Sequence, residues 1–324
     1  MKAITRDRYG SPDVLQLHDV PKPMPGEGEV LVRVRAASIN PYDWHFLRGM
    51  PLFARPAATG LLKPKHRILG SDAAGQVEAV GSGVTRLRAG DQVFGLVEHG
   101  GLAEYLCASE ELLGLKPRNL TFEQAAAVPL AGTTALQGLR DAGHLSPGEN
   151  VMIIGASGGV GTFAVQIAKA FGAHVTGVCS TRNLDLVRSI GADQVIDYTC
   201  TDFTQTADKH DLILQLAGTH SAAALRRALT PSGRLLLSSG DSPNRVIGPL
   251  DRILKAALLS AFVSQDLRAF LAKPRSEDLQ TLTELIEAGK VTPVIDRTYP
   301  LAEAPAALHY LEQGHARGKV VISV

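Results

Sequence analysis

A glycine-rich turn at residues 154–161, with the sequence IGASGGVG, constrains the fold of this chain more than any other segment. The turn follows the apolar run 151–153 and leads into Phe163 and Ile167, which have helical spacing. Such a turn lets the backbone approach a ligand, and the unpaired N–H groups that open a helix attract an anion. A second apolar strand at 174–178 completes a strand–helix–strand unit, so the sequence predicts the pyrophosphate-binding turn of a dinucleotide site.

The spacing within the turn is Ala156-x-Gly158-x-x-Gly161, so alanine replaces the first glycine of the usual fingerprint. The string alone is moderately specific, and the surrounding strands and helix strengthen the prediction. The residues expected to hold the pyrophosphate are Ser157, Gly158, Gly159, Val160 and Gly161.

The residues that follow the second strand distinguish between the two common dinucleotides. An Asp or Glu about 20 residues past the glycines would bind the ribose 2′-hydroxyl. This chain has Ser180, Thr181 and Arg182 there instead. Hydroxyl and guanidinium groups bind a 2′-phosphate that a carboxylate would repel, so the sequence predicts NADP(H). In the alternative interpretation, Ser180 and Thr181 cap the next helix and Arg182 is solvated.

Composition indicates a soluble globular enzyme. The chain has 324 residues, 45% of them apolar, which suits two domains with sizeable cores. A formal net charge of +1 provides no broad basic field, so a nucleic-acid partner is not expected. Only three cysteines are present and the N-terminus lacks a signal-peptide pattern, which together favour the reducing cytoplasm. The apolar stretch 253–263 is too short to span a membrane.

The chain changes character near residue 120. The first part consists of short apolar runs separated by Gly and Pro turns, and is expected to be mostly β. The middle part alternates strands and helices and predicts an α/β fold with a parallel, doubly wound sheet. Helices are expected at 249–271 and 277–288, before a closing strand at 319–324. The strands expected in the sheet are 151–154, 174–178, 194–197, 211–216 and 234–239.

Several motifs in one order resemble the zinc-independent, quinone oxidoreductase branch of the medium-chain dehydrogenase/reductase superfamily, and especially its reticulon-4-interacting-protein-like group. The resemblance implies a GroES-like β-rich catalytic domain built from both chain ends, an inserted Rossmann domain and a homodimer. It therefore divides the chain into catalytic residues 1–121, NADP-binding residues 122–274 and a returning segment 275–324. The motifs lie at residues 1–3, 37–44, 79–84, 90–93, 128–135 and 316–322, together with the glycine turn.

The chain departs from zinc-dependent relatives at their metal ligands. The resemblance places Asn40, Ser71 and the vicinity of Leu130 where those enzymes hold zinc, and none of these residues is a good zinc ligand. Without a Lewis acid, reduction of simple carbonyl groups is disfavoured. Quinones and α,β-unsaturated carbonyl compounds are the expected acceptors, because conjugation delocalises the charge that arrives with hydride.

The resemblance also implies roles for residues in the motif that contains Asn40. Asn40 corresponds to the asparagine at the active-site floor, although an Asn-Pro turn is the simpler role. Asp43 is expected to orient neighbouring groups or to accept bonds from backbone N–H groups. His45 replaces a tyrosine of many relatives, and either a proton-donor or a structural role is open to it. Tyr42 is the competing proton donor, unless it simply packs.

The remaining candidate residues are expected to contact the cofactor. By resemblance, Thr134 lies behind the nicotinamide and Tyr198 near the adenosine 2′-phosphate. Lys319 contacts the cofactor from the closing strand or is a surface lysine. Ligands of open α/β sheets bind at the carboxyl ends of the strands, where this chain has Ala217, Gly218 and Ser239.

Three functional hypotheses follow. The first is an NADPH-dependent, zinc-independent enzyme that transfers hydride to a quinone or another activated carbonyl. The second is a 2-alkenal or enone double-bond reductase, which must also deliver a proton to carbon. The third, from another class, is a regulatory or scaffold protein that binds NADPH with little turnover.

Overall fold

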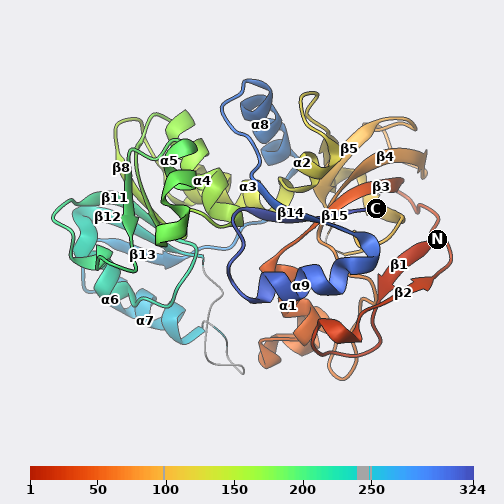
Figure 1. Ribbon diagram of the computed structural model, residues 1–324, viewed down its shortest axis with the longest axis horizontal. Helices are drawn as coiled ribbons and strands as arrows, with labels where there is room; N and C mark the ends of the chain where they lie inside the picture. Colours follow the sequence, from red (N-terminus) through yellow and green to blue (C-terminus); the bar gives the residue numbers. More distant parts are fainter. Residues whose placement is uncertain (98, 239–247, 249) are drawn as a thin grey trace. The chain divides into compact units, whose positions relative to one another are not determined.

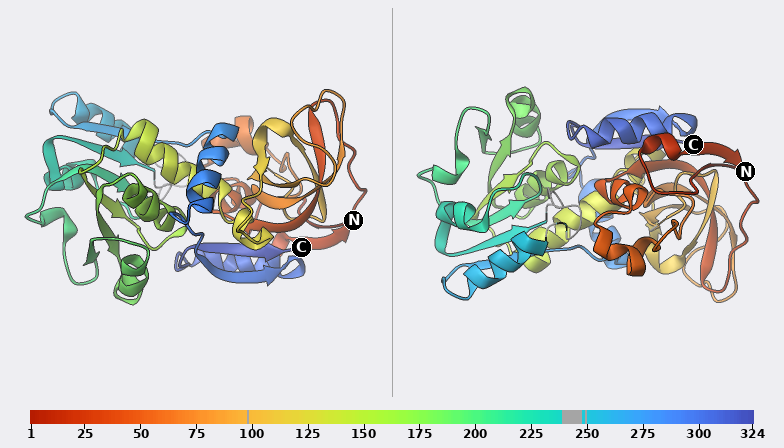
Figure 2. Two further views of the ribbon diagram at one scale, coloured as in Figure 1. Left: turned by 90° about the horizontal axis from the view of Figure 1, so that it is seen from above. Right: turned by 90° about the horizontal axis from the view of Figure 1, so that it is seen from below.

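The computed structural model describes residues 1–97, 99–238, 248 and 250–324. Its internal contacts divide the chain into two compact units. The first comprises Met1–Ala131, Pro274–Glu287 and Pro293–Val324, and therefore contains both chain ends, as Figure 2 shows. The second comprises Gly132–Lys273 and Ala288–Thr292.

The second unit is built on a six-stranded, fully parallel sheet with the order β10-β9-β8-β11-β12-β13. Figure 1 shows α4 and α5 on one side of the sheet and α6 and α7 on the other. The predicted doubly wound parallel sheet is confirmed. Its strands are β8 (Asn150–Ile154), β9 (His174–Cys179), β10 (Gln194–Asp197), β11 (His210–Gln215), β12 (Leu229–Leu237) and β13 (Asp266–Ala269). Its helices are α4 (Gly159–Ala170), α5 (Leu184–Ser189), α6 (Ala222–Leu225) and α7 (Leu250–Ser260); α3 (Pro129–Gln137) begins in the first unit.

The central strands of this sheet are buried on both faces. Met152, Ile213 and Leu235 are fully buried in one hydrophobic cluster. Helices cover both faces of a parallel sheet, so its strands are continuous apolar runs and not alternating ones. This explains why the sequence alone predicts a strand at 151–154.

Close packing explains the glycines of the turn. Gly155 has φ +87°, a left-handed conformation that side-chain-bearing residues rarely adopt. A Cβ atom on Gly161 would lie 2.1 Å from the Gly155 carbonyl oxygen, so the start of α4 lies directly against the turn. Gly158 has no such conflict, because its Cβ would be 3.4 Å from the same oxygen.

The first unit is rich in β structure and carries the chain's ends in one sheet. Its larger sheet has the order β14-β15-β3-β4-β5-β7, with β6 also paired to β3. The C-terminal strand pairs antiparallel with β3, with Val320 opposite Ile39. The strands are β1 (Lys2–Thr5), β2 (Gln16–Asp19), β3 (Glu29–Ile39), β4 (Asp72–Val80), β5 (Gln92–Leu96), β6 (Tyr105–Ser109), β7 (Leu113–Leu115), β14 (Ile295–Pro300) and β15 (Lys319–Ser323). The helices are α1 (Pro41–Arg48), α2 (Phe122–Ala126), α8 (Ser276–Glu287) and α9 (Ala304–Glu312).

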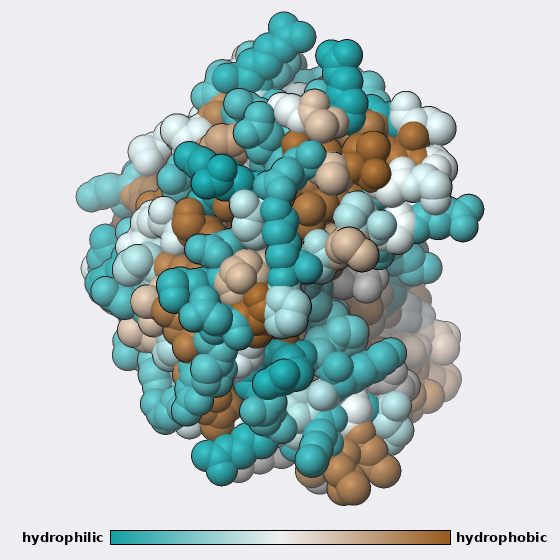
Figure 3. Space-filling view, turned by 90° about the vertical axis from the view of Figure 1, so that its right-hand side faces the viewer, coloured by the Kyte–Doolittle hydropathy of each residue, from teal (hydrophilic) through white to brown (hydrophobic). Residues whose placement is uncertain are grey.

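The core of the first unit is formed by β3, β15 and the helices beside them. Ile39 and Leu47 join Val320 and Leu308 in one buried cluster. In Figure 3 the visible surface is mostly hydrophilic, with apolar side chains scattered among polar ones. The buried cluster lies beneath such a surface, as expected for a globular unit.

The predicted helix at 249–271 is wrong in its second half. α7 ends at Ser260, and Asp266–Ala269 forms the edge strand β13 beside β12. Only Leu267 of this strand is buried. A four-residue strand with one buried side chain has no hydrophobic alternation that the sequence could show, and its pairing with β12 is what makes it a strand. β14 and α9 were not predicted either. Residue 239, placed in the fifth strand, lies outside the described residues.

Helix α7 is not packed in a core on every side. Ala256 is fully buried, whereas Leu254 and Leu258 are 62% and 66% exposed. An apolar helix at this place in the chain could pack in the core, cover a site as a lid or lie in an interface, and this exposure rules out core packing for the two leucines. Among the described residues, none of the helices combines the length and apolarity that crossing a bilayer requires.

The compact units differ from the predicted divisions after residues 121 and 274. α2 packs against β3, β4 and β15, which groups it with the first unit. The short segment Ala288–Thr292 belongs to the second unit. It is tied there by hydrogen bonds between Gln166 and the backbone of Thr292. The predicted boundaries stay predictions about independently folding domains.

We expect Gly161→Ala to lower the free energy of unfolding by about 1–3 kcal/mol, because the added methyl group collides with the turn. Gly158→Ala is the matched control, since its methyl group meets only an ordinary contact. Urea denaturation without cofactor measures both variants. Equal stabilities for the two variants would contradict the packing argument.

Candidate functional site

The glycine turn opens α4, a helix of the second unit. Gly158 is the N-cap residue of α4, and Gly159, Val160 and Gly161 form its first turn. Their N–H groups lie before the first intrahelical hydrogen bonds, at the positive end of the helix dipole. Ser157 is 8% exposed beside them. This arrangement offers donors to an anionic group.

The turn lies beside the carboxyl end of β11. Gln215 is in register with Ile154, the last residue of β8. A Cβ atom on Gly155 would lie 2.8 Å from the Cβ of Ala217. Gly218 follows with φ +76°, and its carbonyl oxygen accepts from Gln215 Nε2 at 3.2 Å. The structure therefore brings the predicted residues Ala217 and Gly218 next to the turn.

The end of β9 contains a hydrogen-bond network that the sequence did not reveal. Asn183 Nδ2 donates to Ser157 Oγ at 3.0 Å and to Ser180 Oγ at 3.2 Å. Ser180 is at the N-cap position of a short helical segment, yet its hydroxyl makes no capping bond. Arg182 is exposed on the same segment. The Ser180 hydroxyl therefore does not cap this helical segment, contrary to the capping interpretation.

A carboxylate lies close to this group. Asp197 is the last residue of the neighbouring strand β10. Its Oδ2 atom accepts a hydrogen bond from Thr181 Oγ1 at 2.5 Å. This hydrogen bond, the largest cause, lowers the pKa of Asp197, with further help from Thr199. Tyr198 follows and is 55% exposed. In this arrangement the hydrogen of the Thr181 hydroxyl goes to Asp197.

Thr134 and Ser239 are two further residues that the sequence predicts at the cofactor. Thr134 lies on α3 and is half-buried. Ser239 lies outside the described residues. The roles proposed for both stay predictions.

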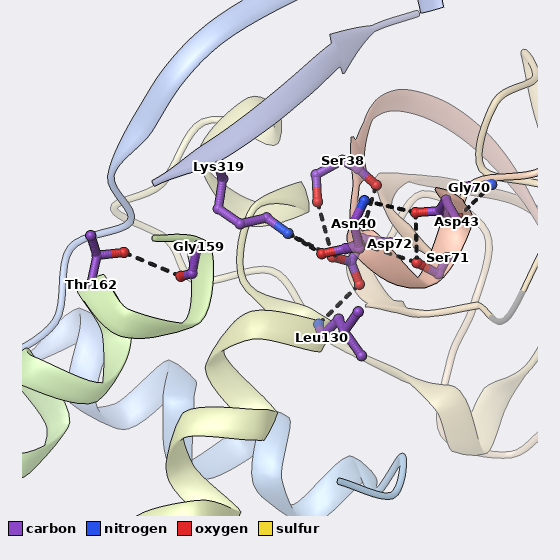
Figure 4. Close-up of polar contacts among 10 residues, drawn as sticks. All are labelled: Ser38, Asn40, Asp43, Gly70, Ser71, Asp72, Leu130, Gly159, Thr162 and Lys319. Atoms are coloured by element: carbon purple, nitrogen blue, oxygen red, sulfur yellow. Dashed lines mark hydrogen bonds and ion pairs between the residues drawn. The ribbon is translucent and has the colours of Figure 1, made fainter. Parts of the chain in front are cut away.

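The first unit contains a buried polar cluster organised by Asp72, at the start of β4 (Figure 4). Asp72 Oδ2 accepts from Ser38 Oγ at 2.9 Å and from Asn40 Nδ2 at 3.0 Å. Asp72 Oδ1 accepts from the Leu130 N–H at 2.9 Å. Lys319 Nζ completes the cluster through Asn40 Oδ1 and through Asp72 Oδ2 at 3.4 Å. Sequence reasoning missed Asp72, although it follows the glycine-serine pair that contains Ser71.

Asp43 joins this cluster from α1. It is 1% exposed and accepts from the N–H groups of Asn40 and Gly70 and from Ser71 Oγ at 2.9, 3.1 and 3.2 Å. Burial, aided by the Asp72 charge, raises the pKa of Asp43 to about 6, against these backbone hydrogen bonds. The structure thus shows that Asp43 both accepts backbone N–H groups and orients Ser71.

Lys319 is not a surface lysine. It is 3% exposed on β15, and burial lowers the pKa of its ammonium while Asp72 and Asp43 oppose that shift. Its ion pair with Asp72 is fully enclosed. A buried cation of this kind needs such partners, because an unpaired charge inside a protein is strongly destabilising.

Tyr42 and His45 lie on α1 with Asn40 and Asp43 at its start. The Tyr42 ring packs on Phe46, with centroids 4.5 Å apart. The His45 ring meets Trp44 edge-on at 4.4 Å. Both candidate proton donors therefore share one short helix, and their roles stay predictions.

The residues at the expected zinc positions do not fit a zinc ion. Asn40 and Ser71 are hydrogen-bonded to one another at 3.1 Å, and Lys319 donates into Asn40. An amide, a hydroxyl and an ammonium offer neither the thiolate nor the imidazole that zinc prefers, and the ammonium repels a second cation. Across the described ranges, His, Cys, Asp and Glu side chains form no group of three or more that could hold a metal ion.

Parts of both units match known families. Residues 26–118 match the family described as "Alcohol dehydrogenase GroES-like domain". Residues 190–322 match the family described as "Zinc-binding dehydrogenase". The predicted GroES-like part is therefore confirmed.

Individual relatives span the whole chain. A "2-methylene-furan-3-one reductase" of Solanum lycopersicum is 37% identical over 99% of this chain and 79% of its own length. A "Chloroplast envelope quinone oxidoreductase homolog" of Arabidopsis thaliana is 34% identical over 99% of this chain and 98% of its own length. Among solved structures, the Escherichia coli quinone oxidoreductase complexed with NADPH has a TM-score of 0.85 and 26% identity, with complete coverage of both chains.

We expect the stability contributed by Asp43 to fall as pH rises. Its folded pKa of about 6 lies above the ordinary value of 3.8. The folded state therefore binds the extra proton, and the contribution is complete below pH 3.8 and lost as pH passes about 6. At about 1.36 kcal/mol per pH unit, the loss is about 3 kcal/mol.

Urea denaturation between pH 4 and 7 checks this expectation against Asp43→Asn, which cannot titrate. Asp185→Asn is the control, because that side chain is fully exposed. Parallel pH profiles for the wild-type protein and Asp43→Asn would show that the expectation is wrong.

Proposed function

This chain belongs to the quinone oxidoreductase branch of the medium-chain dehydrogenase/reductase superfamily, and on that premise we propose that it reduces a quinone or another activated carbonyl compound with NADPH and without zinc. It is an oxidoreductase. The single observation that supports the cofactor most is the turn at 155–161, where glycines let α4 begin directly against the preceding backbone.

The residues of the second unit suit a phosphorylated dinucleotide. A Cβ atom on Gly155 or Gly161 would collide with neighbouring atoms, so the turn is formed by bare backbone. Ser157 and the first turn of α4 would hold the pyrophosphate, and Ser180 with Arg182 would hold the 2′-phosphate. When bound, NADPH supplies the hydride that reduces the acceptor.

We propose that the polar cluster of the first unit forms the floor of the active site. Asp72 fixes the Asn40 amide, and Lys319 places a positive charge beside its oxygen. A preorganised positive charge stabilises the negative charge that develops on a carbonyl oxygen during reduction. Hydride addition to a quinone, followed by protonation, gives the hydroquinone. Its proton would come from Tyr42 or His45, both on α1.

A double-bond reductase is the second candidate function. It is favoured by the 2-methylene-furan-3-one reductase, the relative named above with 37% identity. This reaction needs a proton at carbon, so the proton donor matters more than in quinone reduction. An NADPH-binding protein with little turnover remains the alternative of another class.

A panel of acceptors separates these hypotheses. We expect oxidation of NADPH by 1,4-benzoquinone or a 2-alkenal and little reaction with simple aldehydes, without change on adding EDTA. Absorbance at the NADPH band measures the rate. Loss of activity with EDTA would contradict the zinc-free proposal, and reaction with alkenals alone would establish the double-bond reductase. Binding of NADPH without oxidation by any acceptor would favour the binding protein.

Substitutions at the end of β9 test the preference for NADPH. We expect Arg182→Ala to weaken NADPH about three- to tenfold more than NADH, because an exposed guanidinium gives a charge-assisted bond of modest strength. Asp197→Asn should strengthen the binding of NADPH relative to NADH, since it removes a negatively charged carboxylate next to Thr181. Arg188→Ala, which loses an exposed pair with Asp185, is the control.

Titration of each variant with both dinucleotides by fluorescence gives the dissociation constants. If Arg182→Ala changed the dissociation constants of NADPH and NADH equally, Arg182 would not be part of the 2′-phosphate site. We also propose a cytoplasmic location and a homodimer, both of which rest on the sequence and the family resemblance.

A further inference from the structure

Asn183 connects two parts of the second unit that are distant in sequence. Ser157 follows β8 and Ser180 follows β9, and the two strands are paired with Ile154 opposite Val178. The Asn183 side chain lies between the serine hydroxyls and donates to both, at 3.0 and 3.2 Å. Asn183 is 5% exposed, so its amide is buried, while the Ser180 end of the network is partly exposed.

The Asn183 amide is not used as a helix cap. Asn183 is the N-cap residue of α5, a position where an asparagine side chain ordinarily accepts from the helix backbone. Its side chain makes no such bond. In the described part of the chain, Asn183 Oδ1 is buried without a hydrogen-bond partner, which costs stability. The orientation of the amide therefore serves the two serines and not the helix.

The direction of these hydrogen bonds determines what the serines can do. A hydroxyl has one hydrogen to donate and two lone pairs that accept. Both serine oxygens already accept from Asn183, so their hydrogens point elsewhere. Within the described residues, no protein acceptor receives either hydrogen. Both hydroxyls are thus ready to donate to a ligand.

A phosphate group is the complementary ligand, because its oxygens only accept. In open α/β sheets the pyrophosphate lies at the turn after the first strand, and the adenosine ribose lies at the end of the second. Ser157 and Ser180 occupy these two positions.

We propose that Asn183 is a positioning residue that directs the hydroxyls of Ser157 and Ser180 toward two phosphate groups of NADPH, and thereby couples the two phosphate positions. The proposal rests on the proposed function, because it assumes that the second unit binds NADPH. It adds that one buried amide sets the preference for the 2′-phosphate from behind the binding surface.

A double-mutant cycle tests the coupling, with 2′,5′-ADP and NADPH as probes and calorimetric titration as the measurement. In the wild-type protein, Asn183→Ala should lower the affinity for both probes about tenfold. In a Ser157→Ala/Ser180→Ala background the same substitution should change affinity less than twofold, because the groups that it positions are gone. Ser189→Ala, an exposed hydroxyl on α5 that donates to Leu186, should change nothing.

Asn183→Asp keeps the shape of the side chain but reverses its hydrogen-bond direction. A carboxylate accepts both serine hydrogens and adds a negative charge, so NADPH should weaken more than with Asn183→Ala, and more than NADH. An equal loss from Asn183→Ala in both backgrounds, or wild-type affinity in Asn183→Asp, would overturn the proposal. Failure of both variants to fold, judged by thermal unfolding, would also overturn it, because the role would then be structural.

The wild-type protein distinguishes failure of this proposal from failure of the proposed function. If it binds 2′,5′-ADP and oxidises NADPH while the cycle shows no coupling, only the role of Asn183 is wrong. If it binds neither probe, the proposed function fails and the role of Asn183 fails with it.

Discussion

The buried carboxylate of Asp72 is the interaction on which the first unit depends. It accepts from Ser38 and Asn40 near the end of β3 and from the backbone of Leu130 at α3, and it pairs with Lys319 on β15. An enclosed carboxylate needs all of these donors, because each missing one would leave a desolvated negative charge. The same carboxylate fixes the Asn40 amide and the Lys319 ammonium through direct contacts.

The second unit follows a similar physical rule with neutral groups. Its turn is shaped by the close approach of α4 to Gly155, and the hydroxyls beside the turn are oriented by the buried amide of Asn183. Nearby, Asp197 directs Thr181 in the opposite sense, toward the protein. Neighbouring protein groups therefore decide in which direction each hydroxyl can donate, because a hydroxyl has only one hydrogen.

Local patterns were sufficient to predict much of this protein. The strands β8, β9 and β11 were found because a sheet covered on both faces requires continuous apolar runs. The turn was found because glycines are needed where backbone atoms approach closely. β13 was missed because only Leu267 is buried in it, so its sequence shows no strand pattern and only its pairing with β12 makes it a strand. Asp72 and Asn183 were missed because neither belongs to a short motif whose spacing announces its hydrogen bonds.

The sequence by itself determined the class of fold, the position of the dinucleotide turn and the absence of good zinc ligands at Asn40 and Ser71, since these depend on residue type and short spacing. Only the tertiary structure decided what surrounds those residues. Lys319 is 279 positions from Asn40, yet its ammonium lies against the Asn40 side chain oxygen. Pairing of β15 with β3 creates that contact. No local pattern can report it, because burial and partner arise only when distant segments share one sheet.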